Sequence, residues 1–189
     1  MATSTPWGAS QNKEVITKGI IFYSTSSHGG FKVSPVMNAR IHPAWRNRDG
    51  WYEEDMEWAI VALSFPEFFA DKEVADAENT LIHWMPHQYM EVTGEEIGPG
   101  ESRKLEEEHF RLTHADDYIA MSALSTFHDK RIPGDMVGVI AGRGGRLERG
   151  GYPDDTRMFL VDRDEYIVPR QPWESFVIDP SRHEEIELL

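Results

Sequence analysis

The order of hydrophobic and polar positions near the start of the chain predicts a β-hairpin. Residues 18–26 are rich in β-branched and aromatic side chains, which favour an extended strand. Residues 31–34 alternate apolar and polar side chains, as a half-buried return strand does. Ser27-His28-Gly29-Gly30 lies between them, and its glycines tolerate the positive φ of a tight turn.

The segment 50–65 has the strongest helical pattern in the chain. Ile60 and Val61 widen its apolar stripe until little of the surface is left for water, which indicates a helix packed on both sides. Acidic residues at its start would suit the positive field of a helix N-terminus. We therefore expect a central helix over 53–65. The residues spaced along one face of it are Tyr52, Met56, Ala59 and Leu63.

A second helix is expected to begin at Asp71, which serves as its N-cap, and to end before Pro86. Val74, Ala77, Leu81 and Trp84 recur at helical spacing and would form its buried face. Residues 94–100 contain three glycines and a proline, so they form the best candidate for an internal linker. A short charged helix is predicted over residues 101–112.

The last third of the chain changes to strand-like patterns, and residues 162–166 between two of them predict a helical turn. Together these patterns predict an α+β fold with an N-terminal β-hairpin, two or three central helices and a C-terminal, mainly antiparallel sheet. We expect a flexible lead-in over 1–17 and a single domain over 18–189, with a candidate subdivision at 94–100. The late strands are predicted at 118–124, 136–141, 158–161 and 175–178.

Composition narrows the class of protein. The chain has 189 residues, 40% of them hydrophobic, which suffices for a real core. No apolar run approaches the roughly 18 residues of a membrane span, and the polar N-terminus does not have the pattern of a secretory signal. The chain has no cysteine, so disulfides and thiolate metal sites are excluded. This composition fits a cytoplasmic protein.

The net charge is −14, and it is unevenly placed. Residues 51–100 carry twelve acidic side chains and one basic side chain. Such a surface repels nucleic-acid phosphates, which argues against direct nucleic-acid binding. It suits a partner that is itself basic, such as the nucleic-acid groove of another protein. Solubility alone is the simpler explanation of the same charge.

The acids at the start of the predicted central helix form the first candidate site: Glu53, Glu54, Asp55 and Glu57. On a helix Glu53 and Glu57 are neighbours, and two facing carboxylates can hold Mg²⁺ or share a proton. The helix N-terminus explains the same residues without any function. We predict no metal site and no cofactor.

His28 is the second candidate, because histidine moves protons near neutral pH. It follows four hydroxyl residues and precedes two glycines that let a ligand approach the backbone. An enzyme built here would use His28 with Glu54 and Asp55, whereas the simpler interpretation is a polar turn that contains a histidine. His83 and His87 have helical metal spacing, but Pro86 separates them.

Three motifs stand out in combination: Thr5-Pro6-Trp7-Gly8, Ser27-His28-Gly29-Gly30 and Gly50-Trp51-Tyr52-Glu53-Glu54-Asp55. Further matches lie at 99–102, 137–139 and 176–179. With these motifs the chain resembles an uncharacterised bacterial domain family found on plasmids, prophages and other mobile elements. The resemblance covers nearly the whole chain, and the family carries no assigned activity. It implies a cytoplasmic protein of a bacterial host cell.

This resemblance implies an inhibitor of host defence, of the anti-CRISPR or anti-restriction class, because small acidic proteins of mobile elements often act in this way. The expected protein is non-enzymatic and occupies a basic nucleic-acid-binding surface of a defence complex. A small hydrolase-like enzyme at the Ser24–Gly30 turn is the alternative, and a scaffold module is a third. The oligomeric state stays open. The residues expected to contact the partner are Glu53, Glu54, Asp55, Glu57, Asp71, Glu73, Asp76 and Glu78.

Overall fold

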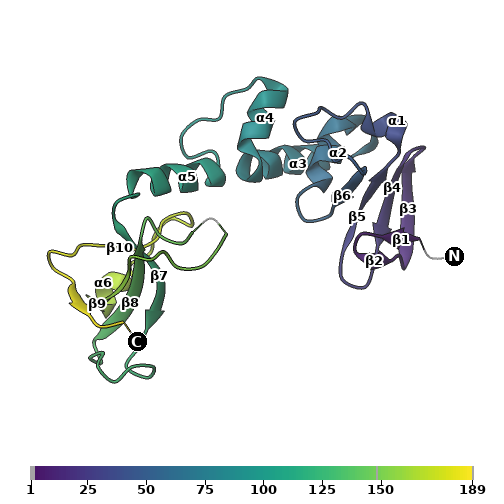
Figure 1. The fold of residues 1–189 in the computed structure, drawn as a ribbon. Helices are drawn as coiled ribbons and strands as arrows, with labels where there is room; N and C mark the ends of the chain where they lie inside the picture. Colours follow the sequence, from purple (N-terminus) through teal and green to yellow (C-terminus); the bar gives the residue numbers. More distant parts are fainter. Residues whose placement is uncertain (1–2, 148, 189) are drawn as a thin grey trace. The chain divides into compact units, whose positions relative to one another are not determined.

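The computed structural model describes residues 3–147 and 149–188 (Figure 1). Its internal contacts divide the chain into two compact units, Met1–Lys104 and Leu105–Leu189, which we call unit 1 and unit 2. Antiparallel strands, a run of helices and a second antiparallel sheet follow one another along the chain, so the α+β prediction is confirmed. The single domain over 18–189 stays a prediction. The division between the units falls shortly after the predicted linker at 94–100.

Unit 1 contains a four-stranded antiparallel sheet in the order β3-β4-β5-β6, and the predicted hairpin is its β4–β5 pair. The predicted lead-in over 1–17 differs from the structure, because residues 12–17 pair with β4 as an edge strand. Residues 12–17 are mostly polar and lack the hydrophobic pattern that predicts a strand, because an exposed edge strand needs few apolar residues. The strands are β1 Ser4–Thr5, β2 Gly8–Ala9, β3 Asn12–Thr17, β4 Ile20–Ser24, β5 Gly29–Val33 and β6 Trp51–Glu53.

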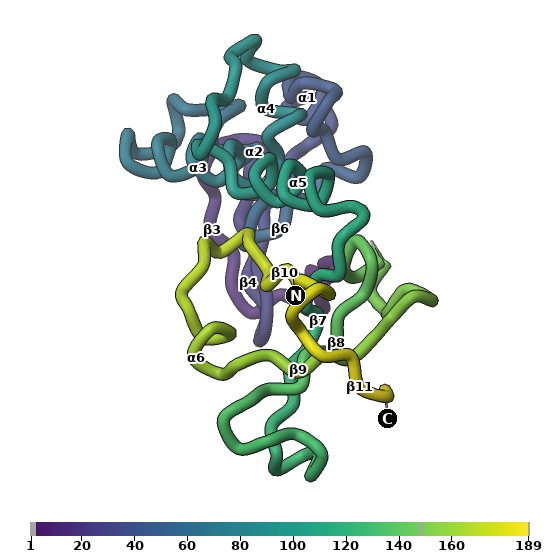
Figure 2. Tube along the Cα trace, turned by 90° about the vertical axis from the view of Figure 1, so that its left-hand side faces the viewer, coloured from purple at the N-terminus to yellow at the C-terminus, as the bar shows by residue number. Residues whose placement is uncertain are grey.

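The helices of unit 1 gather at one end of these strands (Figure 2). The buried side of α2 includes Ala59, Ile60, Val61 and Ala62, which confirms that this helix is central. Helix α5 crosses the boundary between the units. The helices are α1 Pro35–Asn38, α2 Trp58–Ser64, the 3₁₀ helix η1 Pro66–Phe68, α3 Asp71–Trp84, α4 Pro86–Thr93 and α5 Arg103–Thr113.

The central helix begins five residues later than predicted, so the start at Glu53 was wrong. Residues 51–53 instead form β6, in which Trp51, Tyr52 and Glu53 lie opposite Lys32, Phe31 and Gly30 of β5. A turn over 54–57 then leads into α2. Acidic residues mark this position in the sequence, but pairing with a neighbouring strand decides the backbone conformation.

The second helix has the predicted span, but its N-cap is Ala70 and Asp71 is its first residue. The Glu73 carboxylate accepts the Ala70 N–H at 2.8 Å, so the third helical residue supplies the cap. Trp84, predicted on the buried face, is 51% exposed. Pro86 begins α4, because proline lacks the N–H that the first helical position leaves unpaired.

Unit 2 contains a five-stranded antiparallel sheet in the order β10-β7-β8-β9-β11, as predicted for the C-terminal part. Its core includes Tyr118, Val139, Phe159 and Val161. Within the described residues, no helix has the length and apolar character needed to cross a membrane. The elements are β7 Tyr118–Leu124, β8 Met136–Arg143, β9 Thr156–Asp162, α6 Arg163–Tyr166, β10 Val177–Ile178 and β11 Glu184–Ile186.

Candidate functional site

Three sequence motifs that lie far apart along the chain meet in unit 1. The rings of Trp7 and Trp51 contact each other edge to face, with centroids 5.7 Å apart. A Cβ atom on Gly30 would lie 2.2 Å from the Trp7 ring and 2.4 Å from the carbonyl oxygen of Tyr52. Only glycine fits there, because a side chain would displace the tryptophan or the adjacent strand. The second glycine of Ser27-His28-Gly29-Gly30 therefore serves packing.

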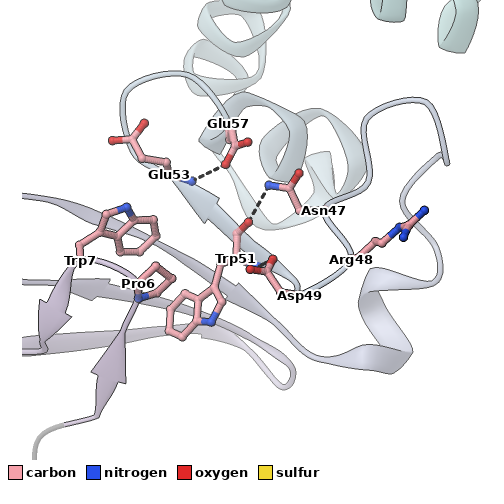
Figure 3. Close-up of a pocket in the computed structure, with 8 residues that line it drawn as sticks. All are labelled: Pro6, Trp7, Asn47, Arg48, Asp49, Trp51, Glu53 and Glu57. Atoms are coloured by element: carbon pink, nitrogen blue, oxygen red, sulfur yellow. Dashed lines mark hydrogen bonds between the residues drawn. The ribbon is translucent and has the colours of Figure 1, made fainter.

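The meeting point of these motifs forms a pocket of about 500 Å³ (Figure 3). One wall comes from the turn between β1 and β2, a second from the loop before β6, and a third from β6 and the start of α2. We call this site the tryptophan pocket. Its lining residues are Pro6, Trp7, Asn47, Arg48, Asp49, Trp51, Glu53 and Glu57.

Hydrogen bonds hold the backbone of the tryptophan pocket in place. The Glu57 carboxylate accepts the N–H of Glu53 at 3.1 Å, and the Asn47 side chain donates to the Trp51 carbonyl oxygen at 2.7 Å (Figure 3). The N–H of Asn47 donates to the Tyr52 hydroxyl at 3.1 Å. These bonds join the loop before β6 to the strand itself, so the pocket walls form a connected structure.

Tyr52 anchors this arrangement from inside the core, where its side chain is fully buried. Its hydroxyl donates to Asn38 Oδ1 at 2.6 Å, and Asn38 is itself buried. Burial raises the pKa of Tyr52 to about 12, because the phenolate would lose its hydration in the core. Tyr52 is therefore a neutral donor throughout the physiological range.

The tryptophan pocket has an acidic lining. Three carboxylates, Asp49, Glu53 and Glu57, line it together with one guanidinium, that of Arg48, which extends away from Glu53 and Glu57 (Figure 3). Glu53 Oε2 accepts the N–H of Asp55 at 2.7 Å. Glu53 Oε1 is buried and has no hydrogen-bond partner among the described residues. A buried carboxylate oxygen of this kind favours any donor that reaches it.

The four acids predicted at a helix start lie in β6 and the following turn instead. Glu53 and Glu57 still contact each other, but through a carboxylate and a backbone N–H rather than as facing side chains on a helix. Asp55 is exposed at the turn. Glu54 lies beside the hairpin, since a Cβ on Gly29 would come within 2.4 Å of its Oε2.

The four predicted acids of α3 are Asp71, Glu73, Asp76 and Glu78, and they have different surroundings. Asp71 and Asp76 are exposed, and Asp76 pairs with Lys72 one turn away. Glu73 caps the helix through the Ala70 N–H. Glu78 accepts the hydroxyl of Tyr89 at 2.7 Å, and Glu95 lies 3.0 Å from the same hydroxyl.

His28 is exposed at the tip of the hairpin. Thr25 Oγ1 accepts the His28 N–H at 3.1 Å and donates to the His28 carbonyl oxygen at 2.8 Å, which fixes the turn. The imidazole Nδ1 lies against the carbonyl oxygen of Ser27. His28 does not line the tryptophan pocket. The catalytic alternative of His28, Glu54 and Asp55 stays a prediction. Across residues 3–147 and 149–188 no cluster of three histidine or acidic residues could hold a metal ion.

A second pocket of about 410 Å³ shares Arg48 and Asp49 with the tryptophan pocket. Its other cations are Lys32 and Arg46, and each already donates to a backbone carbonyl oxygen. Lys32 donates to the carbonyl oxygen of Asp49, and Arg46 donates to that of Ile41. These cations support the loop before β6, and the pocket gives a ligand few vacant donors.

Glu53 and Glu57, which the sequence predicted as partner contacts, both line the tryptophan pocket, whereas Asn47, Arg48 and Asp49 had no predicted role. Trp7 and Trp51 stood out in the sequence only as parts of motifs. The usable signal was the presence of a tryptophan in two of the three motifs, since a tryptophan near the surface often marks a binding site. Its partner across the pocket could not be inferred without the fold.

Comparison with known proteins gives one match. A family model described as a domain of unknown function (DUF7007) covers residues 1–115. The match includes all of unit 1 and ends shortly after α5. No curated protein and no solved structure matches the chain. Most of unit 2, from residue 116 onward, lies outside the family match.

Proposed function

The chain belongs to the DUF7007 family of domains of unknown function, and we propose that it is a non-enzymatic interaction protein that binds a basic surface. The proposed partner is a complex of host defence that handles nucleic acid. The protein would act as an inhibitor of the anti-CRISPR or anti-restriction class, encoded by a mobile genetic element. The resemblance described above supports this class, and the charge distribution supports the mode of binding.

The observation that carries the proposal is the near absence of basic residues between 51 and 100. Lys72 is the single basic side chain there, against twelve acidic ones. Asp55, Asp71 and Asp76 are exposed on unit 1. When acids of this kind meet a basic groove, they gain the charge pairs that nucleic acid would otherwise make, and the two ligands compete.

The test begins with affinity capture from a bacterial lysate that carries defence systems, at low and at moderate salt. The captured complex is then mixed with labelled nucleic acid, and the protein is titrated as a competitor. The informative variant combines Asp55→Asn, Asp71→Asn and Asp76→Asn. We expect competition to weaken by about tenfold or more, because each lost charge pair reduces steering and affinity. Higher salt should also weaken the competition by the original chain, because it screens the charge pairs.

A matched control makes the same change of charge on unit 2. Asp116, Asp154 and Asp164 are exposed there, and their replacement by Asn should leave competition unchanged. Equal losses in both triple variants would mean that net charge alone matters, which contradicts a specific face on unit 1. Unchanged binding of nucleic acid to every captured complex would refute the inhibitor proposal.

A further inference from the structure

We propose that the tryptophan pocket binds the guanidinium group of an arginine side chain on the partner protein. This inference rests on the proposed function, because a basic surface presents such side chains. It adds the specific point of contact, which combines aromatic and acidic groups.

The aromatic part of the tryptophan pocket suits a cation. Trp7 and Trp51 meet at an interplanar angle of 84°, so their rings present surfaces in two directions. The fold already places one cation on this system, since Lys32 Nζ lies 4.8 Å from the centre of the Trp51 ring. Tryptophan has the most favourable aromatic face for a cation, and the attraction increases when water is excluded.

The acidic part supplies acceptors for a donor-rich group. Glu57 uses Oε2 for the N–H of Glu53, and a carboxylate can accept several N–H groups. Glu53 adds negative charge to the lining, but its Oε1 is buried and its carboxylate is directed away from the two indole rings (Figure 3). Asp49 adds a third carboxylate to the lining, whereas Arg48 is the one opposing charge there. The pocket is therefore rich in acceptors and negative overall.

Arginine fits this combination better than lysine. A guanidinium is planar, carries five N–H donors and is weakly hydrated, so it can lie on an indole ring and donate to carboxylates at its edge. A lysine ammonium is compact and strongly hydrated, and it gives up more on leaving water. The pocket, at about 500 Å³, has room for a guanidinium and part of its aliphatic stem.

The experiment is an NMR titration of the ¹⁵N-labelled full chain with three peptides that differ at one position. The peptides are acetyl-Gly-Gly-Xaa-Gly-Gly-amide, where Xaa is arginine, lysine or citrulline. Citrulline has the shape of arginine without its charge. We expect the arginine peptide to shift the indole N–H signals of Trp7 and Trp51 in a saturable way. The lysine peptide should bind at least threefold more weakly, and the citrulline peptide should cause no saturable shift.

Two variants connect the signal to the pocket. Glu57→Gln keeps an oxygen for the Glu53 N–H but removes the charge, and it should weaken arginine binding at least threefold. Trp7→Leu should weaken it at least as much. Asp116→Asn and Trp84→Leu change an exposed acid and an exposed tryptophan outside the pocket lining, and both should bind as the original chain does. A parallel titration with free arginine distinguishes a site for the amino acid from a site for a protein side chain. If free arginine binds as tightly as the arginine peptide or more tightly, the side-chain site is contradicted.

Other outcomes also overturn the inference. Equal shifts with citrulline would show that charge is not recognised, and unchanged binding in both Glu57→Gln and Trp7→Leu would place the peptide elsewhere. The peptide titration requires no partner protein. Failure of the competition test with intact arginine binding would therefore refute the proposed function alone, and the reverse result would refute the pocket alone.

Discussion

The acidic residues of the two units are held in different ways. In unit 2, arginines pair with them: Arg143 and Arg157 donate to Asp155 at 3.2 and 2.9 Å, and Arg131 donates to Asp129 at 2.8 Å. In residues 51–100, acids instead accept backbone N–H groups or a tyrosine hydroxyl, as Glu73 and Glu78 do. Similar acidic content therefore has different consequences. Several carboxylates of unit 2 pair with arginines, whereas residues 51–100 contain a single basic side chain, Lys72.

The same difference appears in the pKa values. The arginines beside them hold the pKa of Asp129, Asp155 and Glu165 below the ordinary range, with Arg131, Arg157 and Arg182 as the main causes. In unit 1 the shifted groups are phenols, and burial raises the pKa of Tyr52 and of Tyr89. We therefore expect unit 1 to be sensitive to alkali and unit 2 to acid.

The largest expected effect is alkaline destabilisation of unit 1. Tyr52 is protonated in the folded state, so its contribution is complete below pH 10 and is lost as the pH rises through its folded pKa of about 12. The loss should approach roughly 2–3 kcal/mol over that interval, at about 1.4 kcal/mol for each pKa unit. Hydrogen exchange followed by mass spectrometry measures the two units separately in the full chain. Equal losses of stability in both units at high pH would contradict the expected difference between them.

Replacement of Tyr52 by phenylalanine should destabilise unit 1 by about 1–3 kcal/mol, because it leaves the buried Asn38 side chain without its donor. Urea titration with exchange protection as the readout checks this value. Unit 2 should keep its protection. The variant should also show a smaller alkaline loss than the original chain, which tests the cause of the first prediction.

Acid should affect unit 2 first. Asp155 has a lowered folded pKa, so its contribution is present above the unfolded value and is lost as the pH falls through the folded one. Asp155→Asn should remove part of this acid dependence and lower the midpoint of thermal unfolding of unit 2. The matched variant Asp76→Asn breaks an exposed pair with Lys72 and should change stability by less than about 1 kcal/mol. A larger loss of stability from Asp76→Asn than from Asp155→Asn would contradict the expected difference between the two units.

The smallest expected effect concerns the cap of α3. Glu73→Ala removes the acceptor of the Ala70 N–H and should cost about 1 kcal/mol, whereas Glu73→Gln keeps an oxygen there and should cost less. Exchange rates of the first amides in α3 report the change. Identical behaviour of the two variants would mean that charge at the helix N-terminus, rather than the hydrogen bond, stabilises the cap.

Local patterns were sufficient where the chain interacts mainly with its sequence neighbours. The span of α3 and the strand over 118–124 match the prediction, because periodicity and terminal residues determine them. The start of α2 and the edge strand β3 were missed. Both depend on pairing with a neighbouring strand, and an exposed polar segment such as β3 leaves little hydrophobic signal.

In the candidate site, the residue types alone already mark the chemically distinctive positions. They identify the acids of 51–100, the tryptophans of two motifs and the glycines of the hairpin turn. The fold brings Trp7, Trp51 and Glu57 into one pocket, and Gly30 makes room for the Trp7 ring. Side-chain type is a local property, whereas a pocket forms where distant backbone segments meet, and composition does not encode which segments meet.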